Sequence, residues 1–210
     1  MKFAIIDTET SGLFDFSKPA DADGQPRLAH LHMIMIDDDD DGVRIVDLFI
    51  KPDGWEISEA VSAINGLTTE KLSEIGVPIS EAIDAYAKAV DDGHIVVAFN
   101  AQYDTKVMRG EMRRAEVDDR FDRTPNICIM RALTSICKIP KKTGKGWKFP
   151  KLSEACAHFG IENDAEHSAD GDARACRALF DRLRADGALP EAAVHYAKVQ
   201  PDRAQAEATG

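Results

Sequence analysis

Two apolar segments, 28–36 and 43–50, lie on either side of the acidic run Asp37–Asp41. Like charges this close together cannot be buried, and the run ends at Gly42, so it predicts a solvent-exposed turn. A cation chelated by these aspartates is the alternative, and we favour the hairpin tip. The segments then form a β-hairpin, so at least two neighbouring strands of any sheet must be antiparallel.

Strand and helix signals alternate along the remaining chain. Strand-like segments are 2–7, 94–100 and about 127–129. Helical segments begin after Thr68, after Ser80, at about 102, at 152 and after Ser168. Thr68, Ser80 and Ser168 are the expected N-caps, and Gly160 is the expected end of the helix that begins at 152. The last helix carries a stripe of residues that we expect to be buried: Ala169, Ala173, Cys176, Phe180 and Leu183. A hairpin followed by strand–helix alternation predicts an α/β fold in which helices cover a mixed sheet.

Composition limits the class of protein. The 210 residues include 37 acidic and 26 basic side chains, a net charge of −11, which argues against non-specific adhesion to polyanions. No segment has the length of a membrane span or the pattern of a signal peptide, and the four cysteines show no pairing motif. We therefore expect a cytoplasmic protein without membrane contact, with one domain over 1–185 and a C-terminal helix or flexible tail over 186–210.

Acidic residues occupy four positions where strands end or helices begin. Asp7 and Glu9 follow the apolar run Phe3–Ile6, and residues two apart on a strand share a face, so their charges would repel without a cation. Asp104 and Asp172 lie in the first turns of predicted helices, where the helix dipole alone would explain either one. Together, four carboxylates can hold two divalent ions about 4 Å apart, the arrangement used for displacement at phosphorus.

His167 precedes Asp172 by five positions, just outside the last helix. Its imidazole titrates near neutral pH, so it can accept a proton from an attacking water. A lone histidine on a loop is more often a satisfied polar residue, but beside the acidic positions we interpret it as the general base.

These residues form three motifs: Asp7-Thr-Glu-Thr-Ser-Gly-Leu13, Asn100-xxx-Asp104 and His167-x-Ala-xx-Asp172. The motifs, together with the segment 64–72, closely resemble the DEDD 3′–5′ exonucleases in their histidine variant, the family of polymerase proofreading subunits and ribonuclease T. The resemblance covers about residues 1–184. It implies a ribonuclease-H-like fold, with a five-stranded mixed sheet whose second strand is antiparallel.

The resemblance also implies roles for individual residues. Asp7, Glu9, Asp104 and Asp172 would hold two Mg²⁺ or Mn²⁺ ions, and His167 would be the base. Thr10, Gly12 and Leu13 would lie along the terminal nucleotide, and Asn100 would position the strand or the backbone of the second motif. The product would be nucleoside 5′-monophosphates.

The chain departs from the family pattern at two places. Asn65-Gly66 stands where His-Gly is usual, so the substrate contact expected of Asn65 cannot titrate. The second motif carries Phe99 before its Asn, and Tyr103 where Phe is common. Both changes spare the five catalytic positions.

A basic segment could compensate for the acidic chain. Residues 138–151 contain six lysines and no acid. Lysines such as Lys141, Lys142 and Lys145 neutralise phosphates without regard to base sequence, and Trp147 offers a face for base stacking. A solvated surface loop is the alternative.

The leading hypothesis is a 3′→5′ exonuclease acting on single-stranded DNA or frayed 3′ ends, in repair or in proofreading beside a DNA polymerase. An exoribonuclease of the same fold is the first alternative, because the catalytic residues are shared and 2′-OH discrimination depends on packing around the sugar. A non-catalytic module that binds a polymerase or a nucleic-acid end is the second. Complete retention of the five catalytic positions argues against that module.

Overall fold

The computed structural model describes residues 1–38, 40–162 and 168–194. Its strands are β1 (Lys2–Thr10), β2 (Leu28–Asp37), β3 (Asp40–Phe49), β4 (Ile95–Ala98) and β5 (Asn126–Cys128). Its helices are α1 (Glu59–Asn65), α2 (Thr69–Ile75), α3 (Ile79–Asp91), α4 (Ala101–Arg114), α5 (Ile129–Cys137), α6 (Leu152–Phe159) and α7 (Ala169–Ala185), with a short 3₁₀ turn, η1 (Phe121–Arg123).

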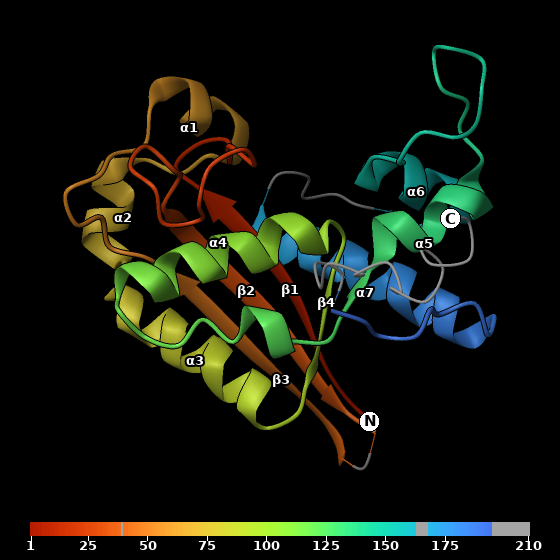
Figure 1. The fold of residues 1–210 in the computed structure, drawn as a ribbon, viewed down its shortest axis with the longest axis horizontal. Helices are drawn as coiled ribbons and strands as arrows, with labels where there is room; N and C mark the ends of the chain where they lie inside the picture. The colour runs from red at the N-terminus through yellow and green to blue at the C-terminus, as the bar shows by residue number, and fades with distance from the viewer. Residues whose placement is uncertain (39, 163–167, 195–210) are drawn as a thin grey trace, which may run out of the picture.

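The five strands form one mixed sheet in the order β3-β2-β1-β4-β5 (Figure 1). Strand β2 runs antiparallel to both β1 and β3, whereas β4 and β5 run parallel to their neighbours. This arrangement confirms the predicted fold class, including the antiparallel second strand and the hairpin of 28–50.

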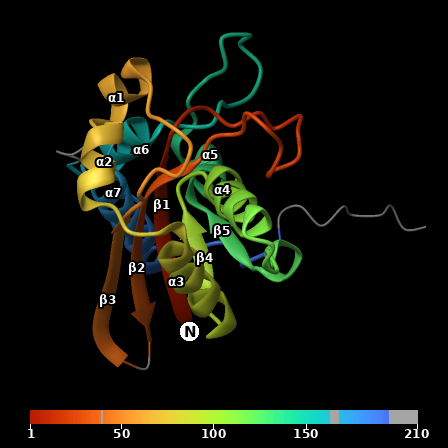
Figure 2. The same cartoon turned by 90° about the vertical axis from the view of Figure 1, so that its left-hand side faces the viewer.

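Helices cover both faces of the sheet (Figure 2). Alternate residues of β1 enter different cores, as the two-residue period of a strand requires. Ala4 and Ile6 pack with α3 and α4, whereas Phe3 and Ile5 pack with α5, α6 and α7. Continuing the alternation places Asp7 and Glu9 on the α7 face, and this is the property of the fold that builds the site.

Most local sequence signals are confirmed. The Thr68 hydroxyl accepts the Lys71 amide at 3.1 Å, the Ser168 hydroxyl accepts the Gly171 amide at 3.3 Å, and Gly160 ends α6 with a φ of 65°. The stripe on α7 is buried throughout.

Two predictions about element boundaries need correction, and two helices were missed. Ser80 does not cap α3, because the helix already begins at Ile79 with Pro78 in the cap position and no side-chain cap. Strand β1 was predicted to end at Asp7 but continues to Thr10, because β2 pairs with it that far, so Glu9 also lies within the strand. Helices α1 and α5 were not predicted.

Other expectations meet the structure only in part. Among the described residues, no helix has the length and apolar character to cross a membrane. All four cysteines are free thiols. His167 and residues 195–210 of the expected tail lie outside the described residues, so the catalytic role of His167 and the proposed domain boundary stay predictions.

Candidate active site

Three carboxylates meet on the α7 face of the sheet. Asp7 and Glu9 come from β1, and Asp172 comes from the first turn of α7, which Ser168 caps. One carboxylate oxygen from each of the three lies within 4.8 Å of the others. Such an all-oxygen set suits a hard divalent cation.

The fourth predicted carboxylate, Asp104, approaches β1 from α4. Its Oδ1 accepts the Thr8 backbone amide at 3.1 Å and the Thr8 hydroxyl at 2.9 Å. Asp104 is only 4% exposed, and with Asp7 and Asp172 it lines a cavity of about 220 Å³. The structure therefore brings all four predicted acids to one place, and Thr8 holds one oxygen of Asp104 in a fixed position. Thr8 was not singled out from the sequence, although its position between the two acids of the first motif was the available signal.

Burial makes the ionised forms of these carboxyl groups energetically unfavourable. Burial raises the pKa of Asp7 well above its usual value, and the charges of Asp104, Asp172 and Glu9 add to the shift. Burial also raises the pKa of Asp104, although hydrogen bonds from Thr8 oppose the change. A bound cation would relieve the repulsion and favour the ionised forms, so the donor set fits a divalent metal.

Glu9 provides a test of this electrostatic cost. Burial raises the pKa of Glu9 from 4.5 to about 7, with the Asn65 amide opposing the shift and the charges of Asp172 and Asp104 adding to it. In metal-free protein the folded state therefore holds a proton that the unfolded chain releases, so this contribution to stability falls as pH rises from 4.5 to about 7.

Glu9→Gln cannot ionise, so its metal-free form should gain roughly 1–3 kcal/mol over the wild type at about pH 8 and little at about pH 4. Chemical unfolding in the presence of a chelator at the two pH values measures this gain. The same gain at both pH values would contradict the account.

Hydroxyl groups fix the turn after β1. The Thr10 Oγ1 and Tyr103 hydroxyl lie 2.7 Å and 3.1 Å from the Gly12 carbonyl oxygen, and 2.6 Å from each other. Beyond this point the Leu13 side chain is 93% exposed. The three residues predicted to lie along a nucleotide thus form a fixed turn followed by a free apolar side chain. The bonds of Tyr103 arise at one of the departures from the family pattern, and sequence reasoning missed them.

The two predicted asparagines occupy different positions. Asn65, at the end of α1, donates through Nδ2 to Glu9 Oε2 at 3.4 Å and accepts the Leu67 amide at 3.1 Å. Its amide therefore supports a carboxylate of the cluster, a contact that the sequence did not suggest. Asn100 takes the N-cap position of α4 without a side-chain cap bond and lines the cavity with Asp104.

The basic segment forms a loop between α5 and α6, which projects from the end of the molecule where β1 ends (Figures 1 and 2). Pro140 pairs with Trp147 across the loop in an isolated bridge. The side chains of Lys141, Lys142 and Lys145 are exposed, and Trp147 is 45% exposed. These predicted substrate-binding residues are therefore accessible to solvent. In the sequence, they lie outside the motifs that carry the four carboxylates.

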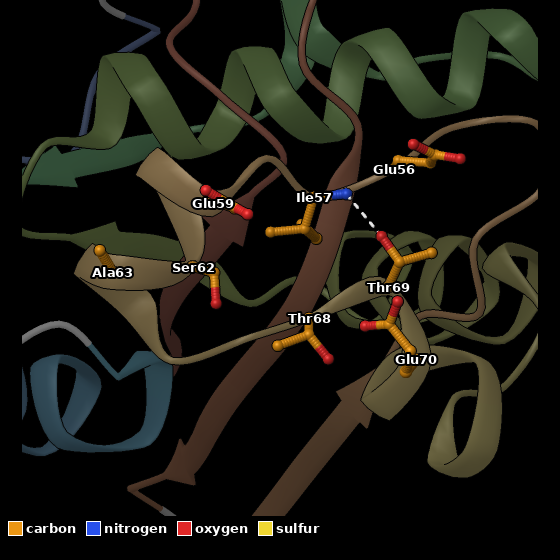
Figure 3. A pocket seen from close by; sticks show the side chains of 8 residues that line it. All are labelled: Glu56, Ile57, Glu59, Ser62, Ala63, Thr68, Thr69 and Glu70. Carbon is orange, nitrogen blue, oxygen red and sulfur yellow. Dashed lines mark hydrogen bonds between the residues drawn. The ribbon is translucent and has the colours of Figure 1, made fainter.

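A second cavity, of about 580 Å³, lies beside α1 and α2 (Figure 3). Three glutamates, Glu56, Glu59 and Glu70, line it, and the Ile57 amide donates to Thr69 across one side at 2.8 Å. Among the described residues, these glutamates do not form a group of potential metal ligands, whereas Asp7, Glu9 and Asp172 do. A bound cation can neutralise phosphate only where ligands converge, so the smaller cavity at Asp7 is the better candidate for chemistry on phosphate.

Comparison with known proteins identifies the family of the chain. Residues 4–180 match the RNase T exonuclease family. The chain belongs to this exonuclease family. Membership confirms the sequence-based prediction of a DEDD-type exonuclease. No curated protein matches the chain by sequence.

Solved structures of exonucleases share the fold. Exonuclease I from Methylocaldum szegediense is similar over 88% of this chain and 40% of its own, with 24% identity and a TM-score of 0.69. E. coli Exonuclease I in complex with a dT13 oligonucleotide is similar over 87% of this chain and 41% of its own, with 19% identity and a TM-score of 0.67. The chain thus spans about two fifths of these proteins.

The nuclease domain of 3′hExo, described as a DEDDh family member bound to rAMP, aligns over almost its full length. The match covers 91% of this chain and 96% of that domain, with 12% identity and a TM-score of 0.69. At 12% identity, the likeness to this structure supports the ribonuclease-H-like fold alone. The assignment to the exonuclease family rests on the match over residues 4–180.

Proposed function

We propose that this exonuclease removes nucleotides from the 3′ end of DNA, single-stranded or frayed, and releases nucleoside 5′-monophosphates in a metal-dependent reaction. The observation that carries the proposal is the convergence of Asp7, Glu9 and Asp172 within 4.8 Å, beside the anchored carboxylate of Asp104.

Two Mg²⁺ or Mn²⁺ ions fit this donor set best. The four carboxylates would hold them through oxygen, the ligand that such ions prefer. When bound, the ions activate water and stabilise the departing oxygen. The protein contributes a rigid set of ligands, because Thr8 fixes Asp104 and Asn65 supports Glu9.

His167 would act as the general base. It directly precedes Ser168, the residue that caps the helix carrying Asp172. In the sequence, a base at this position precedes Asp172 by five residues. Histidine side chains ordinarily titrate close to neutral pH, which suits proton transfer in both directions.

The turn after β1 would receive the last nucleotide. The bonds of Thr10 and Tyr103 to the Gly12 carbonyl hold the backbone in place. The exposed Leu13 side chain would then contact the terminal base, and Asn100 would position the backbone of the strand. Asn65 would contribute through Glu9, in agreement with its observed hydrogen bond.

The basic segment 138–151 would hold the nucleic-acid strand that leads to the cavity at Asp7. Replacing Lys141, Lys142 and Lys145 by Ala should weaken binding roughly tenfold near physiological salt. It should also reduce the slope of log Kd against log salt by up to about 2, because three phosphate contacts on a single strand are lost. Fluorescence anisotropy of a labelled single strand across a salt series measures both quantities.

A triple Ala variant of Lys18, Lys51 and Lys88 is the matched control, since these exposed lysines lie outside the loop. Equal effects from both triple variants would show that net charge, and not the loop, governs binding. The affinity of Trp147→Ala, measured in the same way, tests whether base stacking adds to the electrostatic contribution to binding.

Exoribonuclease activity is the second candidate. Among the similar proteins, one carries a DNA oligonucleotide and another rAMP, so the shared fold accommodates both sugars. A role in repair or in proofreading beside a DNA polymerase, in the cytoplasm, accords with the preference for DNA that we propose.

The test uses 5′-labelled single-stranded DNA, duplex DNA and RNA, incubated with the protein and Mg²⁺ or Mn²⁺. We expect stepwise shortening, fastest on single-stranded DNA and absent with a chelator. Faster shortening of RNA would establish the second candidate. No shortening of any substrate would overturn the proposed function.

A further inference from the structure

A second group of potential metal ligands lies on the same face of the sheet as the carboxylates. It consists of His30 and His32 on β2 and Asp47 on β3. His30 Nε2 lies 2.6 Å and His32 Nδ1 lies 2.9 Å from the same oxygen, Asp47 Oδ1. One ligand atom from each residue lies within 4.8 Å of the other two.

The strand register explains how these residues meet. Across β1, β2 and β3, Asp7 pairs with His32, which pairs with Asp47. His30 pairs with Glu9 on β1 and stacks on the Phe49 ring, with 4.0 Å between the ring centroids. Cross-strand partners project to the same face, so the histidine group lies next to the nuclease carboxylates.

The environment favours ligation. The side chains of His30 and His32 are 6% and 7% exposed, whereas Asp47 is 46% exposed and leaves a route from solvent. Burial lowers the pKa of His30, although Asp47 opposes the shift, so the neutral imidazole that metals require is the main form at neutral pH. Burial alone would raise the pKa of Asp47, but hydrogen bonds from His32 and His30 hold it below its usual value.

The chemistry of the ligands selects the ion. Two imidazoles and one carboxylate suit borderline ions such as Zn²⁺, whereas Mg²⁺ prefers oxygen alone. Zinc ligands lie about 2.0–2.2 Å from the ion, which separates tetrahedral ligand atoms by about 3.3 Å. The Asp47 Oδ1 atom lies closer than that to both imidazoles, at 2.6 Å from His30 Nε2 and 2.9 Å from His32 Nδ1. The half-exposed Asp47 carboxylate must therefore move outward by about half an ångström to admit the ion.

We propose that His30, His32 and Asp47 form a transition-metal site for Zn²⁺, separate from the nuclease carboxylates, which joins β2 to the edge strand β3. The ion takes the place of the two imidazole N–H groups that now face Asp47, and each neutral ring then carries its single proton on its other nitrogen, Nδ1 of His30 and Nε2 of His32. The fourth position is open to water, because the described part of the chain supplies three protein ligands to this group. The site is independent of the proposed function, since none of its three ligands belongs to the nuclease cluster.

Calorimetric titration of ZnCl₂ into the full chain tests the proposal, with excess Mg²⁺ present to occupy the nuclease carboxylates. We expect one tight equivalent, retained in Asp7→Asn and in His158→Gln, whose histidine is exposed on α6. The double variant His30→Gln, His32→Gln should lose at least about 10-fold in affinity, the least that removing a metal's supporting groups costs.

Asp47→Asn keeps the shape of the side chain and decides the matter if the double variant does not fold. Zn²⁺ should raise the melting temperature of the wild type, because it binds the folded state, and raise that of Asp47→Asn much less. Absence of tight Zn²⁺ binding to the wild type would overturn the proposal. So would binding that Asp7→Asn abolishes and the histidine variants retain. A chain that binds Zn²⁺ but hydrolyses no nucleic acid would overturn the proposed function alone.

Discussion

Replacing Asp7 by Asn is expected to lower the rate of 3′→5′ hydrolysis by at least about 1,000-fold, equivalent to about 4 kcal/mol of transition-state stabilisation. The side chain keeps its shape but loses the charge at the centre of the cluster, where Asp104, Asp172 and Glu9 all act on it. Shortening of a 5′-labelled single strand, followed over time at saturating Mg²⁺, measures the loss.

The same variant should be at least as stable as the wild type without metal. Burial raises the pKa of Asp7, so the wild-type folded state bears a cost for ionising this group that Asn does not have. Asp84→Asn is the matched control, because Asp84 is exposed on α3, which packs on the opposite face. Full activity in Asp7→Asn, or equal losses in both variants, would remove Asp7 from the catalytic centre.

Replacing His167 by Ala should lower the turnover rate by about 100- to 10,000-fold and change strand affinity little. A general base acts when the proton of the attacking water moves, so its loss affects the transition state and spares the bound ground state. Single-turnover rates and anisotropy titrations of the same labelled strand separate the two effects.

His158→Ala controls for the loss of an imidazole, since His158 is exposed on α6. A drop in affinity as large as the drop in rate would assign His167 to substrate binding. A rate equal to that of the wild type would require another base.

The pattern of strands could be predicted from sequence because the relevant signals are local. The hairpin follows from charge repulsion at Asp37–Asp41, and the α7 stripe follows from helical periodicity. The end of β1 could not be located this way, because it depends on pairing with β2 as far as Leu28. The start of α3 was misplaced because Ser80 is a good cap in isolation, whereas Pro78 already fixes the backbone for entry into the helix.

The candidate site divides in the same way. Motif spacing indicated which acids would meet, because strand and helix geometry bring such positions to one edge of a sheet. The contacts that hold them could not be predicted. Thr8 anchors Asp104 across 96 positions of sequence, and Asn65 reaches Glu9 across 56 positions. Such long-range contacts arise only when the sheet and its covering helices have assembled.

The central claim is that water attacks the terminal phosphodiester at this carboxylate cluster. The most direct test is hydrolysis of an unlabelled DNA single strand in ¹⁸O-enriched water, with mass spectrometry of the early products. We predict nucleoside 5′-monophosphates released from the 3′ end, each carrying one ¹⁸O on phosphorus, and none from Asp7→Asn. Nucleoside 3′-monophosphates, internal fragments or products without ¹⁸O would contradict the account.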